Sequence, residues 1–230
     1  MDYNMEYNKF VIFMITIMGG KTMTVNQKAE PLFYYNYFLA LEEDLERLSR
    51  FIEFNNDNLS TYSIELAHLL LAASSEVDVI LKEICHLLDP SKEVKNINDY
   101  RKLIKSELPQ STFERFLNQI VLIPRHNLDY VPWLNWGNNQ NPCWWQSYND
   151  VKHERNIYFS KANLQNVLNS IGGLLVVVFY YYWLIDNKKR IMHMSSRDEE
   201  RTRAKTIKSL KPDTNFIKLK DIYNRKWLRY

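Results

Sequence analysis

The segment Asn149 to Arg155, with the sequence NDVKHER, holds the side chains best suited to chemistry on a phosphodiester. A neutral imidazole at His153 can accept a proton as a general base. Arg155 can hold a phosphate by a bidentate contact, and Lys152 can hold one as a point charge. If the segment is helical, Asn149 lies one turn before His153 and can orient it. This segment is the candidate catalytic face.

The same segment also fits a surface with no chemistry. Glu154 offsets the neighbouring cations, and a charged run on a helix is commonly a solvated face. An isolated histidine is more often a hydrogen-bonded structural residue than a base. The preceding pair, Trp144 and Trp145, most simply packs in a core, and base stacking is the alternative.

Two long helices are expected before this segment, over residues 31–55 and 60–90. Apolar residues recur there at spacings of three and four, the pattern of a helix with one buried face. The first stripe comprises Phe38, Leu41, Leu45, Leu48, Phe51 and Ile52. The second comprises Leu66, Leu70, Ala73, Val77, Ile80, Ile84 and Leu88.

Shorter elements and one more long helix follow. We expect a short helix over residues 96–107, and a helical or mixed segment over 111–124. The last long helix ends at Ile185 and starts near Gln146 or near Ser160. Residues 128–145, rich in Pro, Asn and Trp, are expected to form an ordered loop pinned by aromatic side chains.

This pattern predicts an all-α domain of four to five helices over residues 31–187, with the long helices pairing antiparallel. Residues 1–30 are an N-terminal extension, and 188–230 are a basic C-terminal extension. The extension from 188 onward has fourteen Lys and Arg against five Asp and Glu, although the net charge of the chain is only +3. Three interpretations remain for this extension. It contacts an anionic partner such as nucleic acid, it contacts the acidic remainder of the chain, or it is a solvated tail. The candidate anion contacts are Lys188, Lys189 and Arg190, with Arg125 and His126 near the aromatic loop.

Two apolar segments raise the question of a membrane. Phe10 to Gly20 is too short to span a bilayer and lacks a positively charged flank before it, so we expect a strand or an apolar arm. Residues 1–22 could also be an upstream extension from a misassigned start. Val167 to Ile185 approaches the required length, but Asn169, Ser170 and three tyrosines favour a buried core helix, with a span as the alternative.

The two cysteines, Cys85 and Cys143, lie far apart and outside any CxxC motif. Neither a disulfide framework nor a zinc site is indicated, and a reduced, cytoplasmic protein fits best. We expect no metal and no cofactor. No serine, cysteine or aspartate is placed convincingly for a nucleophilic triad.

Three stretches carry a resemblance to a known superfamily. They are IELAHLLLAASSEVDVILKEIC, VLIPRHNLDYVPWLNW and WWQSYNDVKHERNIYFSKANLQNVLNSIGGLL. Together, over roughly residues 38–182, they resemble uncharacterised bacterial proteins similar to the HEPN superfamily. The resemblance implies a four- or five-helix bundle, commonly a homodimer, and in many members a metal-independent ribonuclease of toxin–antitoxin, abortive-infection or other anti-phage systems. In active members an Arg holds the phosphate and a His assists attack by the ribose 2′-hydroxyl.

This chain departs from the HEPN pattern in one respect. Active members have an Arg four to six residues ahead of the His, whereas here His153 precedes Arg155. The resemblance therefore implies only candidates: His153 as base, Arg155 or Lys152 as phosphate holder, and Asn149 as orienter. Glu76 or Asp78 of the second long helix is the expected polar neighbour.

The expected function is that of a bacterial defence or toxin-type protein that binds or cleaves RNA. The alternative is a non-catalytic regulatory subunit that docks a partner protein of a defence or toxin–antitoxin complex. The reversed order of His and Arg keeps both hypotheses open.

Overall fold

The computed structural model describes residues 32–210 and 216–220, of which 72% are helical. The predicted all-α domain is confirmed as mostly helical, but the described residues form seven α-helices rather than four or five, and they include a small antiparallel sheet. Predictions for residues 1–30, including the apolar segment Phe10 to Gly20, lie outside the described residues. The α-helices are α2 (Phe33–Leu48), α3 (Ile64–Leu88), α4 (Ile97–Glu107), α5 (Gln110–Leu117), α6 (Cys143–Tyr158), α7 (Leu164–Asn187) and α8 (Ser196–Leu210).

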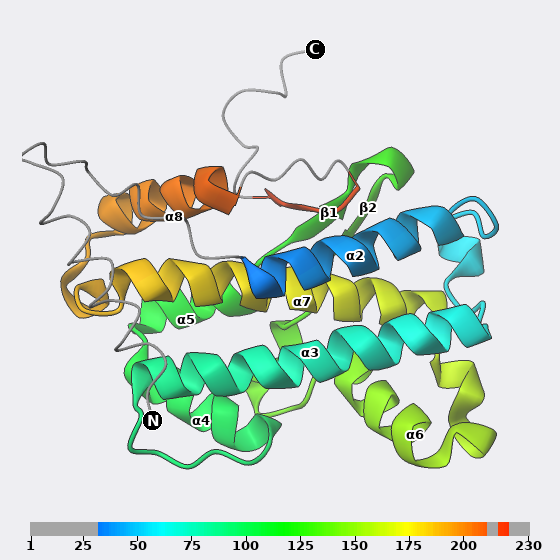
Figure 1. The fold of residues 1–230 in the computed structure, drawn as a ribbon, viewed down its shortest axis with the longest axis horizontal. Helices are drawn as coiled ribbons and strands as arrows, with labels where there is room; N and C mark the ends of the chain where they lie inside the picture. The colour runs from blue at the N-terminus through cyan, green and yellow to red at the C-terminus, as the bar shows by residue number, and fades with distance from the viewer. Residues whose placement is uncertain (1–31, 211–215, 221–230) are drawn as a thin grey trace, which may run out of the picture. The chain divides into compact units, whose positions relative to one another are not determined.

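The core forms around α7, whose most extensive contact is with α3 (Figure 1). Both helices begin at a side-chain cap: Ser63 accepts from the backbone N–H of Leu66, and Asn163 accepts from that of Asn166. The predicted α3 stripe is buried except at Leu88, which is only half-buried. The predicted α2 stripe fails at its end, because α2 stops at Leu48 and Phe51 beyond it is 79% exposed.

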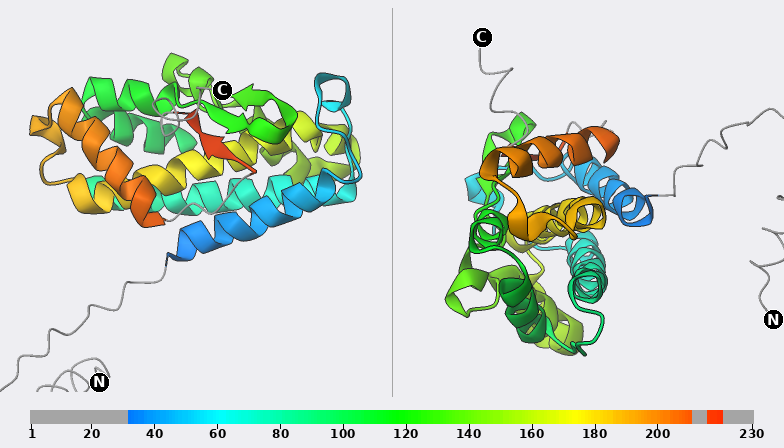
Figure 2. Two further views of the ribbon diagram at one scale, coloured as in Figure 1. Left: turned by 90° about the horizontal axis from the view of Figure 1, so that it is seen from above. Right: turned by 90° about the vertical axis from the view of Figure 1, so that its left-hand side faces the viewer.

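The helices α3 and α7 run parallel. At their N-terminal ends the backbone N–H of Leu164 donates to the carbonyl of Thr61 at 2.9 Å. At their C-terminal ends Lys188 Nζ donates to the carbonyl of Leu87 at 2.6 Å. In Figure 2, right, α2, α3 and α7 are seen nearly end-on and packed together. The expected antiparallel pairing therefore holds for α2 with α3, whereas α3 with α7 is parallel.

The aromatic loop is ordered, as predicted, and it is folded onto α7. It contains strand β2 (Leu128–Tyr130) and the 3₁₀ helix η3 (Leu134–Asn138). The indole N–H of Trp133 donates to the carbonyl of Gly173 at 3.2 Å, and that of Trp144 donates to the carbonyl of Pro132 at 2.9 Å. All of Trp133, Trp136, Trp144 and Trp145 are buried, so the tryptophans serve packing.

The sheet has the strand order β2–β1–β3 and is antiparallel. Strand β1 (Val121–Ile123) occupies part of the segment expected to be helical or mixed. Its partner β3 (Lys218–Leu219) comes from the region expected as a basic C-terminal extension. The buried carboxylate of Glu42 on α2 accepts the backbone N–H of Ile217 at 2.8 Å, which attaches this strand to the helical core.

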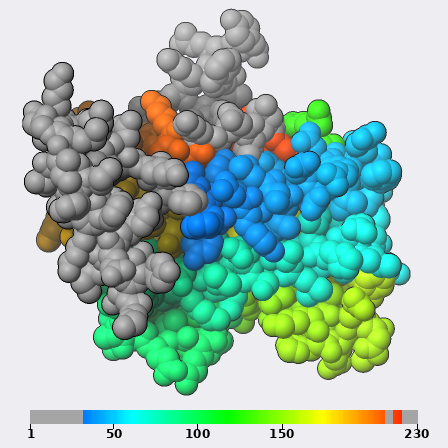
Figure 3. Space-filling view, viewed as in Figure 1, coloured from blue at the N-terminus to red at the C-terminus, as the bar shows by residue number. Residues whose placement is uncertain are grey.

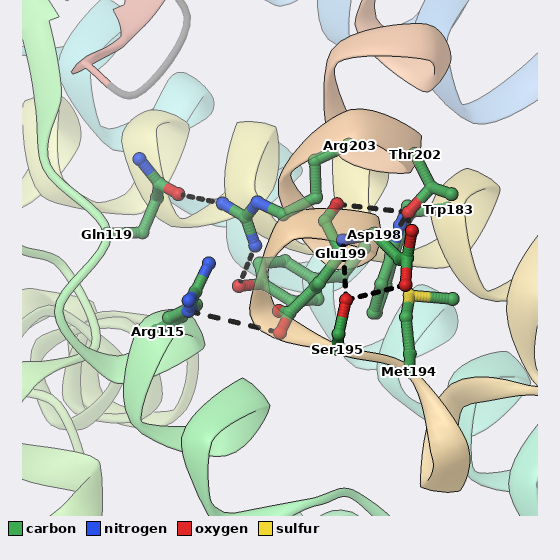
Figure 4. A network of polar contacts seen from close by, with 10 residues as sticks. Arg115, Gln119, Trp183, Met194, Ser195, Asp198, Glu199, Thr202 and Arg203 are labelled. Atoms are coloured by element: carbon green, nitrogen blue, oxygen red, sulfur yellow. Dashed lines mark hydrogen bonds and ion pairs between the residues drawn. The ribbon is translucent and has the colours of Figure 1, made fainter.

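The region expected as a basic extension packs on the domain through helix α8. The guanidinium of Arg203, 5% exposed, donates to the hydroxyl of Tyr180 on α7 and to the side chain of Gln119 (Figure 4). The indole N–H of Trp183 donates to Thr202 at 3.0 Å. The basic region therefore contacts the body by buried, specific hydrogen bonds.

Helix α7 is long and apolar enough to cross a bilayer by length and composition. In the structure, 78% of its most apolar 18-residue window is buried inside the protein. Two adjacent glycines, Gly172 and Gly173, let the chain around Pro132 and the ring of Trp144 approach its backbone closely.

Candidate functional site

The candidate catalytic segment forms one wall of a groove of about 810 Å³ between α3 and the end of α6. In the space-filling view the yellow-green surface of α6 adjoins the cyan first half of α3 (Figure 3). Three predicted site residues, Lys152, His153 and Arg155, all line this groove. Its remaining lining residues are Asn156, Val151, Phe159 of the 3₁₀ helix η4 (Phe159–Lys161), Ile64, Ala67 and Leu71.

A bend in α6 brings His153 and Arg155 to the same groove. On a straight helix two residues that are two positions apart point about 200° away from each other, so they cannot share one face. Glu154, between them, has non-helical backbone angles, φ −137° and ψ 51°, and divides α6 into two helical pieces. The bend reorients the last helical turn of α6, so that Arg155 lines the same groove as His153. One site can therefore contain both residues although the histidine precedes the arginine.

The three groove residues differ in their partners. Lys152 Nζ donates to the hydroxyl of Tyr148 at 3.2 Å and lies 5.3 Å from the centre of its ring. The side chains of His153 and Arg155 have no hydrogen bond or ion pair with another residue of the described ranges, and both residues are exposed. Their polar groups are therefore available to a ligand.

Asn149 is separated from this group. Its side-chain amide donates to the carbonyl of Trp145 one turn earlier, at 3.0 Å, and it does not line the groove. The predicted orienting contact with His153 is thus replaced by a bond to the amide's own helix.

The expected polar neighbours on α3 also lie away from the groove. Asp78 accepts from the hydroxyl of Tyr100 at 2.9 Å and from Lys82 Nζ at 2.6 Å. Glu76 is close to Tyr34 of α2, whose pKa is raised first by burial and then by nearby groups that include this carboxylate. Burial also raises the pKa of Glu76 itself. Neither carboxylate lines the groove.

Arg125 and His126 lie on the 3₁₀ helix η2 (Pro124–His126), beside the sheet. Arg125 forms an ion pair with Glu46 of α2 at 3.0 Å. The ring of His126 packs between Phe54 and Phe216, and its buried Nε2 has no hydrogen bond within the described ranges. Arg125 thus contacts α2 and His126 packs between two phenylalanines, and neither residue lines the groove that contains His153.

Lys188, Lys189 and Arg190 follow the C-terminal end of α7. Lys188 contacts α3 at Leu87, which is roughly 24 Å along that helix from Leu71 in the groove. Arg190 donates to the side chain of Asn187, and the two lysines line a separate small pocket of about 230 Å³. The predicted anion contacts are therefore spread over different surfaces.

Sequence reasoning missed the apolar floor of the groove. Ile64 at the start of α3 is 62% exposed although it belongs to an apolar helix, and Leu71 two turns later is half-buried. Both lie on the side of α3 opposite its buried stripe. These apolar residues on the second side of the helix could have indicated the groove from the sequence.

Within the described ranges, no group of three or more His, Cys, Asp or Glu residues converges as a metal site. Cys85 is buried, which raises its pKa to about 12, and Cys143 is exposed. The groove thus offers an imidazole, two cations and an apolar floor.

Comparison of the chain with family models, curated proteins and solved structures found no match.

Proposed function

We propose that the protein binds RNA in the groove between α3 and α6 and cleaves it there without a metal. The observation that carries this proposal is the convergence of Lys152, His153 and Arg155 on one groove, with His153 and Arg155 unengaged by other described residues. Cationic side chains bind the backbone phosphates, and an apolar floor can accept a base.

In the proposed reaction His153 accepts the proton of a ribose 2′-hydroxyl, and the resulting alkoxide attacks the adjacent phosphorus. Arg155 and Lys152 hold the phosphate oxygens, on which negative charge increases during the attack. The 5′-oxygen leaves and takes a proton from solvent, which reaches the exposed groove. The products are a 2′,3′-cyclic phosphate and a 5′-hydroxyl end, so the chemistry of the cut ends is itself diagnostic.

The biological setting in this proposal follows from the HEPN resemblance: a homodimeric, cytoplasmic, bacterial toxin-type or anti-phage protein. The feature of the structure that supports this setting is the mostly helical fold, with α7 packed against α2 and α3. The sheet and helix α8 are additions to the simple bundle that the resemblance implies.

A second candidate function is the docking of a partner protein in the same groove, without catalysis. The specific observation that favours it is the apolar floor with two exposed isoleucines nearby, Ile64 in the groove and Ile157 just after the bend. Exposed apolar surface rimmed by polar residues commonly marks protein interaction sites.

The two functions are separated by expressing wild type, His153→Ala and Arg155→Ala and following growth and total-RNA integrity. His68→Ala and Arg50→Ala change exposed residues outside the groove and serve as matched controls. Under the nuclease proposal, RNA breakage and growth arrest are lost in the two groove variants only, and circular dichroism shows that both remain folded. Breakage by purified wild type must also persist in EDTA and leave cyclic phosphate ends. Breakage that is equal in all five proteins would refute the proposed role of the groove.

A further inference from the structure

The bend in α6 is tied together by side chains that belong to three different elements. Asp150, before the bend, forms an ion pair with Lys161 of η4, after the bend, at 2.6 Å. The ammonium of Lys161 also lies 4.6 Å from the centre of the Tyr158 ring in the last helical turn. One lysine therefore contacts both pieces of the bent helix.

Asn166 of α7 makes a second connection across the same bend. Its side-chain amide donates to the hydroxyl of Ser147, before the bend, at 3.1 Å. It also donates to the carbonyl of Lys161, after the bend, at 2.9 Å. Asn166 therefore connects both sides of the bend to α7, the buried central helix.

A bend of this kind needs external support. Kinks usually occur at Pro, Gly or an inserted group, whereas Glu154 is an ordinary helix former with no such neighbour in the sequence. Non-helical angles at Glu154 give up regular helical hydrogen bonding around that residue, so contacts outside the helix must offset the loss.

We propose that Asp150, Lys161 and Asn166 form a brace that maintains the bend and so holds Arg155 beside His153 in the groove. The three are positioning residues, because none of them lines the groove. The consequence for RNA rests on the proposed function, whereas the consequence for the position of the last turn of α6 does not.

The structural consequence is tested by spin-label distances in the full chain. One label replaces exposed His68 on α3 and the other replaces exposed Ile157 after the bend, in a Cys143→Ser background, since Cys85 is buried. Asn166→Ala is compared with Asn169→Ala, a matched change in the same helix. The side-chain amide of Asn169 donates to the carbonyl of Gln165, one turn earlier in α7. We expect the distance distribution to shift or broaden in Asn166→Ala and to stay unchanged in Asn169→Ala.

Two further variants address folding and specificity. Asp150→Asn keeps the shape of the side chain but removes the ion pair, so it should give the same change with little risk of unfolding. The exchange Asp150→Lys with Lys161→Asp reverses the pair and should restore the wild-type distances at least in part. An unchanged distribution in both Asn166→Ala and Asp150→Asn would overturn the brace.

The functional consequence is read from RNA cleavage by the same proteins. We expect Asn166→Ala and Asp150→Asn to lower the rate by on the order of tenfold to a hundredfold, toward that of Arg155→Ala, because a displacement of about 1 Å can cost that much. If Arg155→Ala is defective but both brace variants cleave normally, the brace is overturned and the nuclease stands. If His153→Ala and Arg155→Ala cleave like wild type, the proposed function fails, and the spin-label distances alone decide for or against the brace.

Discussion

Glu42 of α2 accepts a hydrogen bond from the backbone N–H of Ile217, 175 positions later in the chain, at 2.8 Å. Burial raises the pKa of this carboxyl from 4.5 to about 7, and Glu46 contributes in the same direction. The hydrogen bond from Ile217 and the charge of Lys218 act in the opposite direction but do not outweigh burial. The attachment of strand β3 to the core is therefore linked to pH.

The first prediction is that the free energy of unfolding falls as pH rises from about 4.5 to about 7. Over this range the folded protein keeps a proton on Glu42 that the unfolded chain releases, so stability is fully present below the unfolded pKa and is lost as pH passes the folded value. The slope is at most about 1.4 kcal/mol per pH unit. Urea denaturation at a series of pH values measures it.

The matched variants for this prediction are Glu42→Gln and Glu43→Gln. Glu42→Gln should remove the slope contributed by this group, whereas Glu43 is exposed and its replacement should leave the slope unchanged. A Glu42→Gln protein whose pH dependence parallels that of wild type would show that another group is responsible.

The second prediction concerns Arg203, whose buried guanidinium joins α8 to Tyr180 and Gln119 and lies 5.0 Å from the Phe179 ring. Arg203→Ala leaves buried polar partners unsatisfied and should lower the free energy of unfolding by about 3 kcal/mol. Arg203→Lys keeps the charge but lacks the planar guanidinium that donates to two partners at once. Its free energy of unfolding should therefore lie between those of wild type and Arg203→Ala.

The control for Arg203 is Arg201→Ala, two residues earlier on the exposed face of α8. Urea denaturation followed by tryptophan fluorescence is a suitable measurement, because Trp183 donates to Thr202 of the same helix. Equal stability of Arg203→Ala and Arg201→Ala would mean that α8 is not held by this network.

The third prediction concerns the close approach of the aromatic loop to α7. A Cβ at Gly173 would lie 2.9 Å from Cζ2 of the buried Trp144 ring, whereas one at Gly172 would lie 3.3 Å from Pro132 and Val121. Overpacking in Gly173→Ala should lower the free energy of unfolding by about 1 to 3 kcal/mol. The better helix propensity of alanine should offset about 1 kcal/mol of this loss. Gly172→Ala should be close to neutral.

Thermal unfolding of the two glycine variants tests this difference directly. The pair is closely matched, since both glycines are buried in the middle of the same helix and gain the same propensity. A larger loss of Tm in Gly172→Ala than in Gly173→Ala would contradict the packing that we describe.

The long helices could be predicted from sequence because their signals are local. The α3 stripe from Leu66 to Ile84 is continuous over several turns, and Ser63 is a recognisable cap. The sheet could not be predicted, because its strands have two or three residues and β3 pairs with a strand about a hundred positions earlier. Pairing over such a separation depends on tertiary contacts, such as the hydrogen bond between Glu42 and Ile217. The periodicity of apolar residues along the sequence does not reveal such contacts.

The candidate site was predictable in its residue types but not in its geometry. On a straight helix Asn149 would be the partner of His153, and Arg155, two positions after the histidine, would point to another side. The bend at Glu154 rearranges that face, and nothing in the local sequence marks it, since its supports come from η4 and α7. Helix α8 likewise could not be predicted within the basic extension after residue 187, because its buried face has few apolar residues and includes Arg203.

The last prediction concerns the salt dependence of RNA binding in the groove. If Arg155 neutralises one backbone phosphate, Arg155→Ala should weaken binding of a short single-stranded RNA and reduce the slope of log K against log salt by about 0.7. Fluorescence anisotropy between about 50 and about 200 mM salt measures both quantities. His153→Ala should weaken binding less, because the proposed role of His153 is proton transfer rather than phosphate binding.

Arg197→Ala on the exposed face of α8 is the control for this slope, since it removes the same charge far from α6. A decrease in slope confined to Arg155→Ala would assign the phosphate to the groove. The same decrease in Arg197→Ala would instead indicate that RNA is held by the net charge of the surface, and the bend in α6 would then have no role in recognition.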